Sequence, residues 1–460
     1  MKIADLNFPQ CIRSKVACPS AGFVLLALLF FAAVPPLSRP QQTAASKTHI
    51  NSQRLQGTLE KLSEFGRNPD GGVTRIGYSE TDMAAREYVI GLMKSAGLDV
   101  RIDAAGNIFG HRSGAEKLPI LLFGSHIDSV KHGGNFDGDV GSMGGIEVLH
   151  ALNDAKVKTR HPLEVVIWTN EEGNHFGLGT LGSGVAAGLL GPEILERKDE
   201  QGLTIADWLR RYGQDPSHLT NARIPPGALA AFLELHIEQG PFLDEKKIPI
   251  GVVQGIVGLK RRICVVTGFA NHAGTTPMDR RKDALAAASK DVLAVRDVVR
   301  AEPGKQVGTV GFMKVEPGAI NVIPGRAEFP VELRDLDAAK IDHLWEGIEA
   351  RFKQIDKEEN VETHCDLLEE NAPSRSDAAI QNAIRDAAKS LDLATMDLPS
   401  SAVQDSQQIA KIASMGMIFI PSRDGISHSP KEFSSWPDIA NGAEVLYRVV
   451  LLLDDRLNRN

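Results

Sequence analysis

Histidines and carboxylates recur in this chain just after apolar runs. His126 follows the apolar run 118–123, and Asp137 stands a short, glycine-rich stretch later. Imidazole together with carboxylate is a ligand set that suits Zn²⁺ and similar divalent ions. Taken alone, this segment is equally well interpreted as a strand-to-loop junction whose histidine is hydrogen-bonded in the core.

Three further apolar runs lead into residues of the same kind. The run 163–169 is followed by Glu171 and Glu172, and two later runs carry His236 and His428 near their ends. A histidine in a loop is usually satisfied by hydrogen bonds, so no one of these positions is informative by itself. Their recurrence at separate run ends predicts that they meet in one metal site.

The combined set predicts a centre of two divalent metal ions. Such a centre needs a carboxylate that bridges both ions, with further ligands on each side, and Asp137 is the expected bridge. His126 and His236 are then the remaining ligands of one ion. Glu172 and His428 are the remaining ligands of the other. Zn²⁺ is the expected ion, with Mn²⁺, Co²⁺ and Ni²⁺ as alternatives.

Glu171 is the predicted general base of this centre. It stands next to the proposed ligand Glu172, from where its carboxylate can reach a metal-activated water and pass the proton to a leaving nitrogen. The alternative is a solvated acidic pair, as most such doublets are. We rank the catalytic interpretation first because the pair follows a buried run, as the proposed ligands do.

The runs that carry these residues have the pattern of an α/β fold. Apolar residues fill both faces of 118–123 and 163–169, which is typical of buried parallel strands. Amphipathic helical patterns at 80–96 and 141–153 alternate with them. The alternation predicts a mostly parallel sheet with helices on both faces. The carboxyl ends of such strands are where open α/β sheets bind ligands.

Residues 256–370 have a different pattern, which predicts an inserted second domain. Their order is strand, helix, strand, strand, helix, strand, with expected ranges 261–267, 282–299, 306–315, 327–333, 338–357 and 361–367. This is the order of a ferredoxin-like α+β unit. The catalytic domain then consists of two parts, 46–255 and 371–460, and the chain length of 460 residues agrees with two domains.

Residues 1–45 are predicted to be a signal peptide or an N-terminal anchor. Lys2, Arg13 and Lys15 precede the apolar segment 21–34, which two prolines end. About fourteen apolar residues fit a signal-peptide core better than a membrane span of roughly twenty. We expect export to the periplasm or the medium. The alternative is a retained anchor, which would give the protein its only contact with a membrane.

Charge and cysteine content argue against some kinds of partner and some kinds of cysteine site. The net charge of −8 argues against nucleic acid as a partner. The cysteines are Cys11, Cys18, Cys264 and Cys365, without a CxxC pair, so neither a zinc ribbon nor a disulfide framework is indicated. Cys264 and Cys365 fall in expected strands and are interpreted as packing residues.

Several segments resemble the M20 metallohydrolases, in the branch of N-carbamoyl-L-amino-acid hydrolase, β-ureidopropionase and allantoate amidohydrolase. The residues that carry the resemblance lie in 124–130, 133–138, 171–172, 236–240, 271–278, 318–325 and 426–429. The resemblance runs from about residue 51 to the C-terminus. Histidine at position 236 separates this branch from many M20 peptidases, which have an acidic ligand there. The resemblance as a whole implies hydrolysis of a C–N bond in a linear ureido or amide compound that carries a carboxylate.

The resemblance also implies roles for individual residues. Asp128 is expected to orient the His126 imidazole. The inserted domain is expected to be a lid and dimerisation unit, with His272 reaching the partner subunit's site of a homodimer to stabilise the oxyanion. The residues expected to bind the substrate are Gln239, Arg261, Asn321, Arg334 and Gln404; an Arg fork matches a carboxylate bidentately.

Two positions depart from the family pattern. Gln404 stands where relatives carry a histidine, and an amide can neither take up a proton nor ligate zinc well. Asn174 and His175 stand where an arginine often follows the glutamate pair. Two alternatives therefore stay open, an M20 aminopeptidase or dipeptidase and a binding protein of the same fold that has lost turnover.

Overall fold

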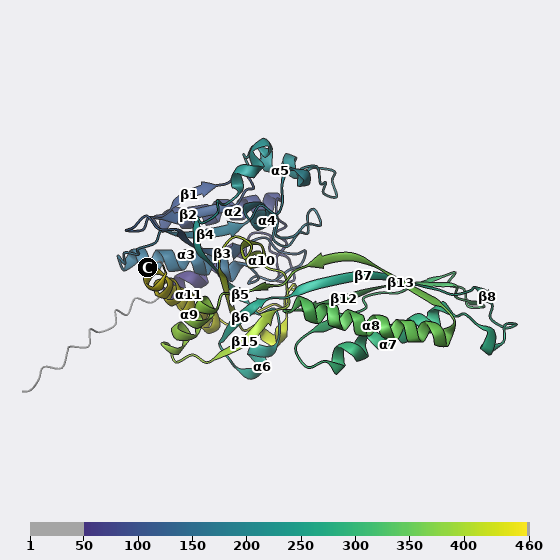
Figure 1. The fold of residues 1–460 in the computed structure, drawn as a ribbon. Coiled ribbons are helices and arrows are strands. Elements are labelled where there is room, and N and C mark those ends of the chain that lie inside the picture. The colour runs from purple at the N-terminus through teal and green to yellow at the C-terminus, as the bar shows by residue number, and fades with distance from the viewer. Residues whose placement is uncertain (1–49, 458–460) are drawn as a thin grey trace, which may run out of the picture. The chain divides into compact units, whose positions relative to one another are not determined.

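The computed structural model describes residues 50–457 (Figure 1), so the predicted leader 1–45 lies outside the described residues. Residues 50–457 belong to one compact unit, in which the strands fall into a large sheet, a smaller sheet and a short ribbon. Among residues 50–457 no helix is both long and apolar enough to cross a bilayer.

The large sheet has nine strands in the order β1-β2-β4-β3-β5-β16-β6-β14, with β15 beside β6. Its centre, β4-β3-β5-β16, is parallel, and β6 pairs parallel with β15, whereas the other pairs are antiparallel. The strands are β1 (Asp99–Ile102), β2 (Ile108–Arg112), β3 (Ile120–His126), β4 (Leu163–Trp168), β5 (Leu229–Ile237), β6 (Ile250–Ile256), β14 (Ser374–Arg375), β15 (Thr395–Ser400) and β16 (Met415–Ile420).

Both faces of this sheet are covered. Val165 and Ile167 of β4 belong to one hydrophobic core, and Val166 and Trp168 belong to another. Successive side chains of a strand point to opposite faces, so every residue of β4 is buried. This is why the central strands are mostly apolar, with a few buried polar residues such as Glu164. The predicted fold class, an α/β sheet with helices on both faces, is confirmed.

The helices of the large sheet fall into two groups. The first core contains residues of α1 (Ser52–Leu62), α2 (Glu80–Ser95), α3 (Asp139–Asp154), α9 (Ala378–Lys389) and α11 (Trp436–Arg456). The remaining elements are α4 (Leu181–Ala186), α5 (Ile205–Arg211), α6 (Phe242–Lys246), α10 (Asp405–Ile409) and the 3-10 turns η1 (Pro192–Ile194), η2 (Pro216–Ala222) and η4 (Arg423–Gly425). Side-chain caps begin several of them; Ser79 accepts from the Asp82 N–H at the start of α2.

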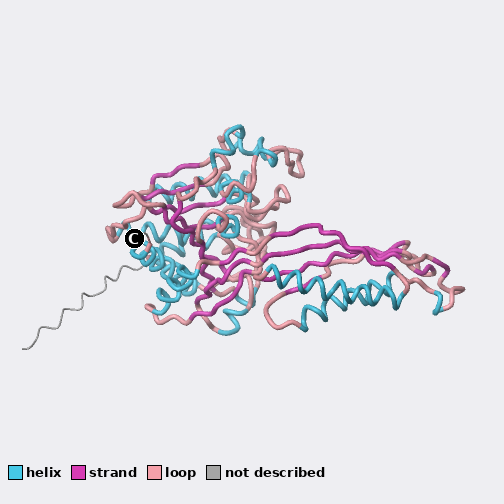
Figure 2. The backbone as a smooth tube through the Cα atoms, viewed as in Figure 1, coloured by secondary structure: helices cyan, strands magenta, loops and turns pink. Residues whose placement is uncertain are grey.

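The smaller sheet has the order β10-β12-β7-β13, with β9 beside β12, and all pairs are antiparallel. Its elements are β7 (Gly258–Thr267), η3 (Met278–Arg280), α7 (Ala284–Ala301), β9 (Val307–Thr309), β10 (Lys314–Glu316), β12 (Arg326–Asp335), α8 (Ala338–Glu359) and β13 (Glu362–Asn371). Both α7 and α8 lie along one face of the sheet (Figure 2). The predicted ferredoxin-like order is observed.

One predicted strand within 256–370 is wrong in its extent. The range 306–315 is not one strand but two, β9 and β10. Both pair with β12, at opposite ends: β9 pairs with 332–334 and β10 with 326–328. Alternation along the sequence does not report where pairing with a neighbour stops, so the break was invisible to it.

Cys264 and Cys365 do pack in the core of the smaller sheet, but the expectation that the cysteines form no disulfide is wrong for this pair. Cys264 on β7 lies directly opposite Cys365 on β13 in the antiparallel register, and the two form a disulfide across a sequence separation of 101. No short spacing motif marks this pair. Only the register of the two strands brings the sulfurs together.

Candidate metal and active site

Four adjacent strands deliver the predicted ligands to one edge of the large sheet. His126 is the last residue of β3, His236 lies at the end of β5, and β4 ends just before Glu171 and Glu172. The loop that carries His428 follows β16. Because β4-β3-β5-β16 are parallel neighbours, their carboxyl ends meet at the same edge, which is the ligand edge of open α/β sheets.

The first cluster consists of three buried residues, His126, Asp137 and His236, with one ligand atom of each within 4.8 Å of the others. His236 Nε2 lies 3.2 Å from Asp137 Oδ1, and His126 Nε2 lies 3.6 Å from the same oxygen. Ligands about 2.0–2.2 Å from a shared Zn²⁺ are separated by distances of this size. The donor set therefore fits a divalent cation.

The second cluster consists of Asp137, Glu172 and His428, whose ligand atoms also lie within 4.8 Å of one another. His428 Nε2 lies 3.5 Å from Asp137 Oδ2 and 3.4 Å from Glu172 Oε1. Asp137 thus offers Oδ1 to the first cluster and Oδ2 to the second. This is the geometry of a carboxylate that can bridge two cations.

The tautomers of the two buried histidines suit this role. Nδ1 of His126 lies 2.9 Å from the Asp128 carbonyl oxygen, and Nδ1 of His236 lies 2.9 Å from the Ile237 carbonyl oxygen. An Nδ1–H that donates to a carbonyl leaves the lone pair on Nε2, the nitrogen that faces Asp137. The Gly138 N–H donates to His236 Nε2, which agrees with this tautomer.

Gly138 explains how the loop can return beneath His126. Its φ is +66°, and a Cβ there would lie 2.5 Å from atoms of the His126 ring. A residue with a side chain would therefore be strained and would displace the imidazole. The glycine lets α3 begin directly after the proposed bridging carboxylate.

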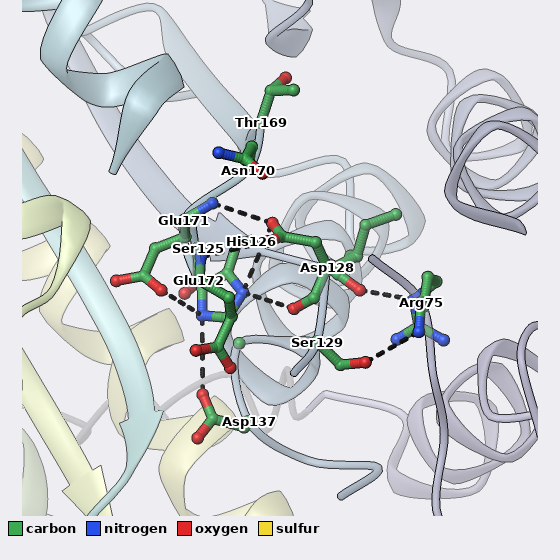
Figure 3. Close-up of polar contacts among 12 residues, drawn as sticks. Arg75, Ser125, His126, Asp128, Ser129, Asp137, Thr169, Asn170, Glu171 and Glu172 are labelled. Carbon is green, nitrogen blue, oxygen red and sulfur yellow. Dashed lines mark hydrogen bonds and ion pairs between the residues drawn. The ribbon is translucent and has the colours of Figure 1, made fainter. Parts of the chain in front are cut away.

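Asp128 contacts both the glutamate pair and His126. Its Oδ1 accepts from the Glu171 N–H at 3.0 Å and its Oδ2 from the Glu172 N–H at 3.1 Å. The carboxylate is 3.9 Å from His126 Nδ1, which bonds to the Asp128 backbone carbonyl instead. Figure 3 shows these contacts. The Asp128 side chain holds the glutamate pair, and its main chain holds the histidine.

Glu171 is buried beside the first cluster and is not a member of either ligand cluster. Its carboxylate points toward the His126 ring (Figure 3), with Oε2 3.7 Å from Nε2. Burial raises the pKa of Glu171 well above its usual value, and the charges of neighbouring carboxylates add to this while His126 opposes it. A carboxyl poised to hold a proton is what a general base that later acts as an acid requires.

The charges at the centre are acidic overall. Burial and the charge of Asp137 raise the pKa of Glu172 well above its usual value. Burial acts to raise the pKa of Asp137 as well, but His236 and His126 hold it well below its usual value. Divalent cations favour the ionised form of carboxylates around them. The accumulation of buried carboxylates therefore fits a cationic centre.

Gln239 and Gln404 form a hydrogen-bonded chain that ends on the bridging carboxylate. Gln404 Nε2 donates to Gln239 Oε1 at 2.9 Å, and Gln239 Nε2 donates to Asp137 Oδ2 at 2.7 Å. Gln404 is buried. The Gln404 amide is thus connected to the proposed ligand Asp137, and both glutamines line the cavity beside it.

The two arginines expected to bind the substrate contact carboxylates of this chain. Arg261 pairs with Glu332 and Glu369, and Arg334 Nε lies 2.7 Å from Glu332 Oε1. Arg334 also donates to the Ser401 carbonyl oxygen. Glu332 thus holds both guanidinium groups, so a substrate carboxylate would have to compete with it.

The structure does not bring His272 and Asn321 to the clusters. Both are exposed; His272 lies on β8 (Asn271–His272), and Asn321 directly precedes β11 (Val322–Ile323), which pairs with β8. Among residues 50–457, no hydrogen bond or ion pair joins them to Asp137 or its partners. Their assigned roles, with His272 acting from the partner subunit, stay predictions.

A cavity of about 700 Å³ opens beside the clusters. It is lined by Asp137, Glu171, Glu172 and His428, which offer the polar groups. Apolar side chains line it as well, namely Leu178, Leu189, Leu190 and Val403. The cavity thus combines a reactive polar centre with apolar wall, which is typical of small-molecule sites.

Sequence reasoning missed one buried carboxylate at the site. Glu432 accepts hydrogen bonds from the backbone next to both Asp137 and His428. Its one sequence signal is an acidic residue four positions after a proposed ligand, which is common on protein surfaces. Nothing in that spacing shows that the side chain is buried.

Known proteins share both the sequence and the fold. Residues 122–452 match Peptidase family M20/M25/M40. N-carbamoyl-L-amino acid amidohydrolase of Geobacillus stearothermophilus is 44% identical over 402 residues, covering 87% of this chain and 98% of that protein. Ureidoglycolate hydrolase of Arabidopsis thaliana is 37% identical over 426 residues, covering 89% of each.

A solved structure supports the same assignment. An amidase of the hydantoinase/carbamoylase family from Burkholderia multivorans is 37% identical and superposes with a TM-score of 0.82, over 88% of this chain and 98% of that one. The predicted resemblance is thereby confirmed. The chain belongs to the M20/M25/M40 family, in the branch whose relatives are amidohydrolases.

Proposed function

We propose that this protein is a two-metal amidohydrolase that cleaves the C–N bond of a linear ureido compound, with N-carbamoyl-L-amino acids as the leading substrate class. The observation that carries this proposal is Asp137, whose two oxygens each face a separate histidine-containing cluster. Two relatives named N-carbamoyl-L-amino-acid amidohydrolase, which match this chain over 98% of their own length, support it.

The residues present can hold two divalent cations and perform the proton transfers. His126 and His236 are placed for one ion, Glu172 and His428 for the other, and Asp137 for both. When bound, such ions supply Lewis acidity and lower the pKa of water to about 7. Zn²⁺ suits this donor set, with Mn²⁺, Co²⁺ and Ni²⁺ as alternatives.

The chain's own groups then direct the reaction. Glu171 takes the proton of the attacking water and delivers it to the leaving nitrogen. Asp128 fixes the backbone of Glu171 and so sets where its carboxylate lies. Hydrolysis of a carbamoyl substrate yields carbon dioxide, ammonia and the free amino acid. The leucines and valine of the cavity offer packing to an apolar amino-acid side chain, on a wall that also carries polar residues such as Gln407, Gln408 and Lys411.

Release of ammonia tests this function. Purified protein is incubated with Zn²⁺, Mn²⁺ or Co²⁺ and with N-carbamoyl amino acids, allantoate and dipeptides, using the Glu171→Gln variant as the blank. We expect ammonia from N-carbamoyl amino acids, most rapidly from those with apolar side chains. Cleavage of dipeptides alone would favour an M20 peptidase instead, and a metal-loaded protein that turns over nothing would favour a binding protein.

We propose a homodimer in which His272 completes the partner subunit's site and stabilises the oxyanion. His272 is exposed on β8 and, among residues 50–457, belongs to neither cluster, which supports a role outside its own chain. After subunit exchange, an equal mixture of inactive His272→Ala and Glu171→Gln variants should regain about a quarter of wild-type activity, because half of the dimers have one intact site. No recovery in a confirmed mixed dimer would contradict the proposal.

We also propose export, with the leader 1–45 removed or retained as an anchor. The Cys264–Cys365 disulfide supports an oxidising compartment, since disulfides rarely persist in the cytosol. Denatured protein from the cell envelope or medium should show no free thiol, because Cys11 and Cys18 leave with the leader. Two free thiols would indicate a retained anchor. Cytosolic protein with Cys264 and Cys365 reduced would contradict export.

A further inference from the structure

Two loops that carry proposed metal ligands meet on one buried side chain, Glu432. One loop contains Asp137, and the other, almost three hundred residues later, contains His428. Glu432 is 3% exposed, and no role in the proposed reaction accounts for burying its carboxylate there. A carboxylate is costly to bury unless its oxygens are fully hydrogen-bonded, so its contacts identify what it does.

Each oxygen of Glu432 serves a different loop. Oε1 accepts from the N–H groups of Phe136 and Asp137, at 2.9 and 3.0 Å. Oε2 accepts from the Ser427 hydroxyl at 2.9 Å and from the His428 N–H at 3.3 Å. Ser427 Oγ also lies 2.7 Å from Asp137 Oδ2. The Glu432 carboxylate therefore joins the backbone of Asp137 to the backbone of His428.

The Asp137 loop is shaped to admit this carboxylate. A Cβ at Gly134 would lie 2.0 Å from Glu432 Oε1 and 2.1 Å from its carboxyl carbon. Any side chain at position 134 would therefore push Glu432 out. This steric requirement is independent of the hydrogen bonds and points to the same contact.

We propose that Glu432 is a positioning residue that fixes the distance between Asp137 and His428 and so makes the second cation site. The positioning role of Glu432 depends on the proposed function only for the identity of the bound cation. The first cluster does not depend on Glu432 in the same way. His126 and His236 are held by bonds from Nδ1 to the backbone carbonyls of Asp128 and Ile237, and Glu432 contacts neither histidine. Loss of Glu432 therefore weakens the second cation site more than the first, because it releases two ligands of the second site, Asp137 and His428, and only Asp137 of the first.

Metal stoichiometry and affinity test this proposal without any substrate. The wild-type protein, stripped and titrated with Zn²⁺, should bind two ions per chain. Glu432→Ala should retain one ion and bind the second about 10–100-fold more weakly, the usual cost of losing a residue that orients a ligand. Glu432→Gln should lose part of this affinity, because its amide N–H₂ would face the His428 N–H, donor against donor. Gly134→Ala should reproduce the loss.

Glu147→Ala is the matched control. Glu147 is 3% exposed and accepts from the Asn51 N–H and the Arg54 guanidinium, but it contacts no proposed ligand. We expect it to lose thermal stability and keep both ions. If Glu432→Ala does not fold, the isosteric Glu432→Gln decides. Two ions at wild-type affinity in either folded Glu432 variant, or fewer than two in the wild type, would overturn the proposal. Absent carbamoylase activity would instead overturn the proposed function alone.

Discussion

Replacement of Glu171 by glutamine is expected to lower kcat/KM for the ureido substrate by about 10³-fold, within the range for loss of a general base. Glutamine has nearly the same shape but cannot take a proton from water. Glu171 belongs to neither ligand cluster, and its backbone is held by Asp128. We therefore expect the variant to bind two ions and to melt at the wild-type temperature. Initial rates of ammonia release, with metal content measured on the same sample, check this.

Glu164→Gln is the control for this substitution. Glu164 lies on the same strand that leads to Glu171, is buried, and pairs with Arg101 and His111 away from the cavity. The same chemical change there should leave kcat/KM unchanged. A Glu171→Gln variant within tenfold of wild type would rule out the proton-transfer role. A variant that had lost its cations would show that Glu171 acts as a ligand instead.

The fold was predictable where the pattern along the chain is local. The helix predicted at 80–96 is α2 (Glu80–Ser95), because a serine cap and an apolar stripe mark it within its own sequence. The central strands were equally clear, since burial on both faces makes them mostly apolar. The split of 306–315 and the Cys264–Cys365 disulfide were not predictable, because each depends on which strand lies alongside.

The candidate site divides in the same way. Residue type and position after a strand were enough to propose Asp137 and the histidines, and the structure gathers them at one edge. The hydrogen-bond partners of individual side chains could not be predicted from the sequence. Glu332 holds Arg261 and Arg334, and Glu432 contacts a loop nearly three hundred positions earlier. Sequence shows what a side chain can do, whereas its partner is set by tertiary packing.

Asp137→Ala is expected to have the largest effect of any single ligand change, because both clusters share this residue. Removing one carboxylate takes a ligand from each cation site, so we expect neither ion to be retained after dialysis and activity to fall to background. His428→Ala is the matched comparison. It removes a ligand from the second cluster only and should leave one ion per chain.

Thermal unfolding with and without Zn²⁺ separates lost binding from lost folding. A ligand at 100 times its Kd stabilises the native state by about 2.7 kcal/mol. The wild type should therefore melt higher with added Zn²⁺, His428→Ala should keep part of the gain, and Asp137→Ala should gain nothing while folding normally without metal. Two ions bound by Asp137→Ala would mean that the clusters are independent. The bridging geometry, and with it the two-metal mechanism, would then have to be abandoned.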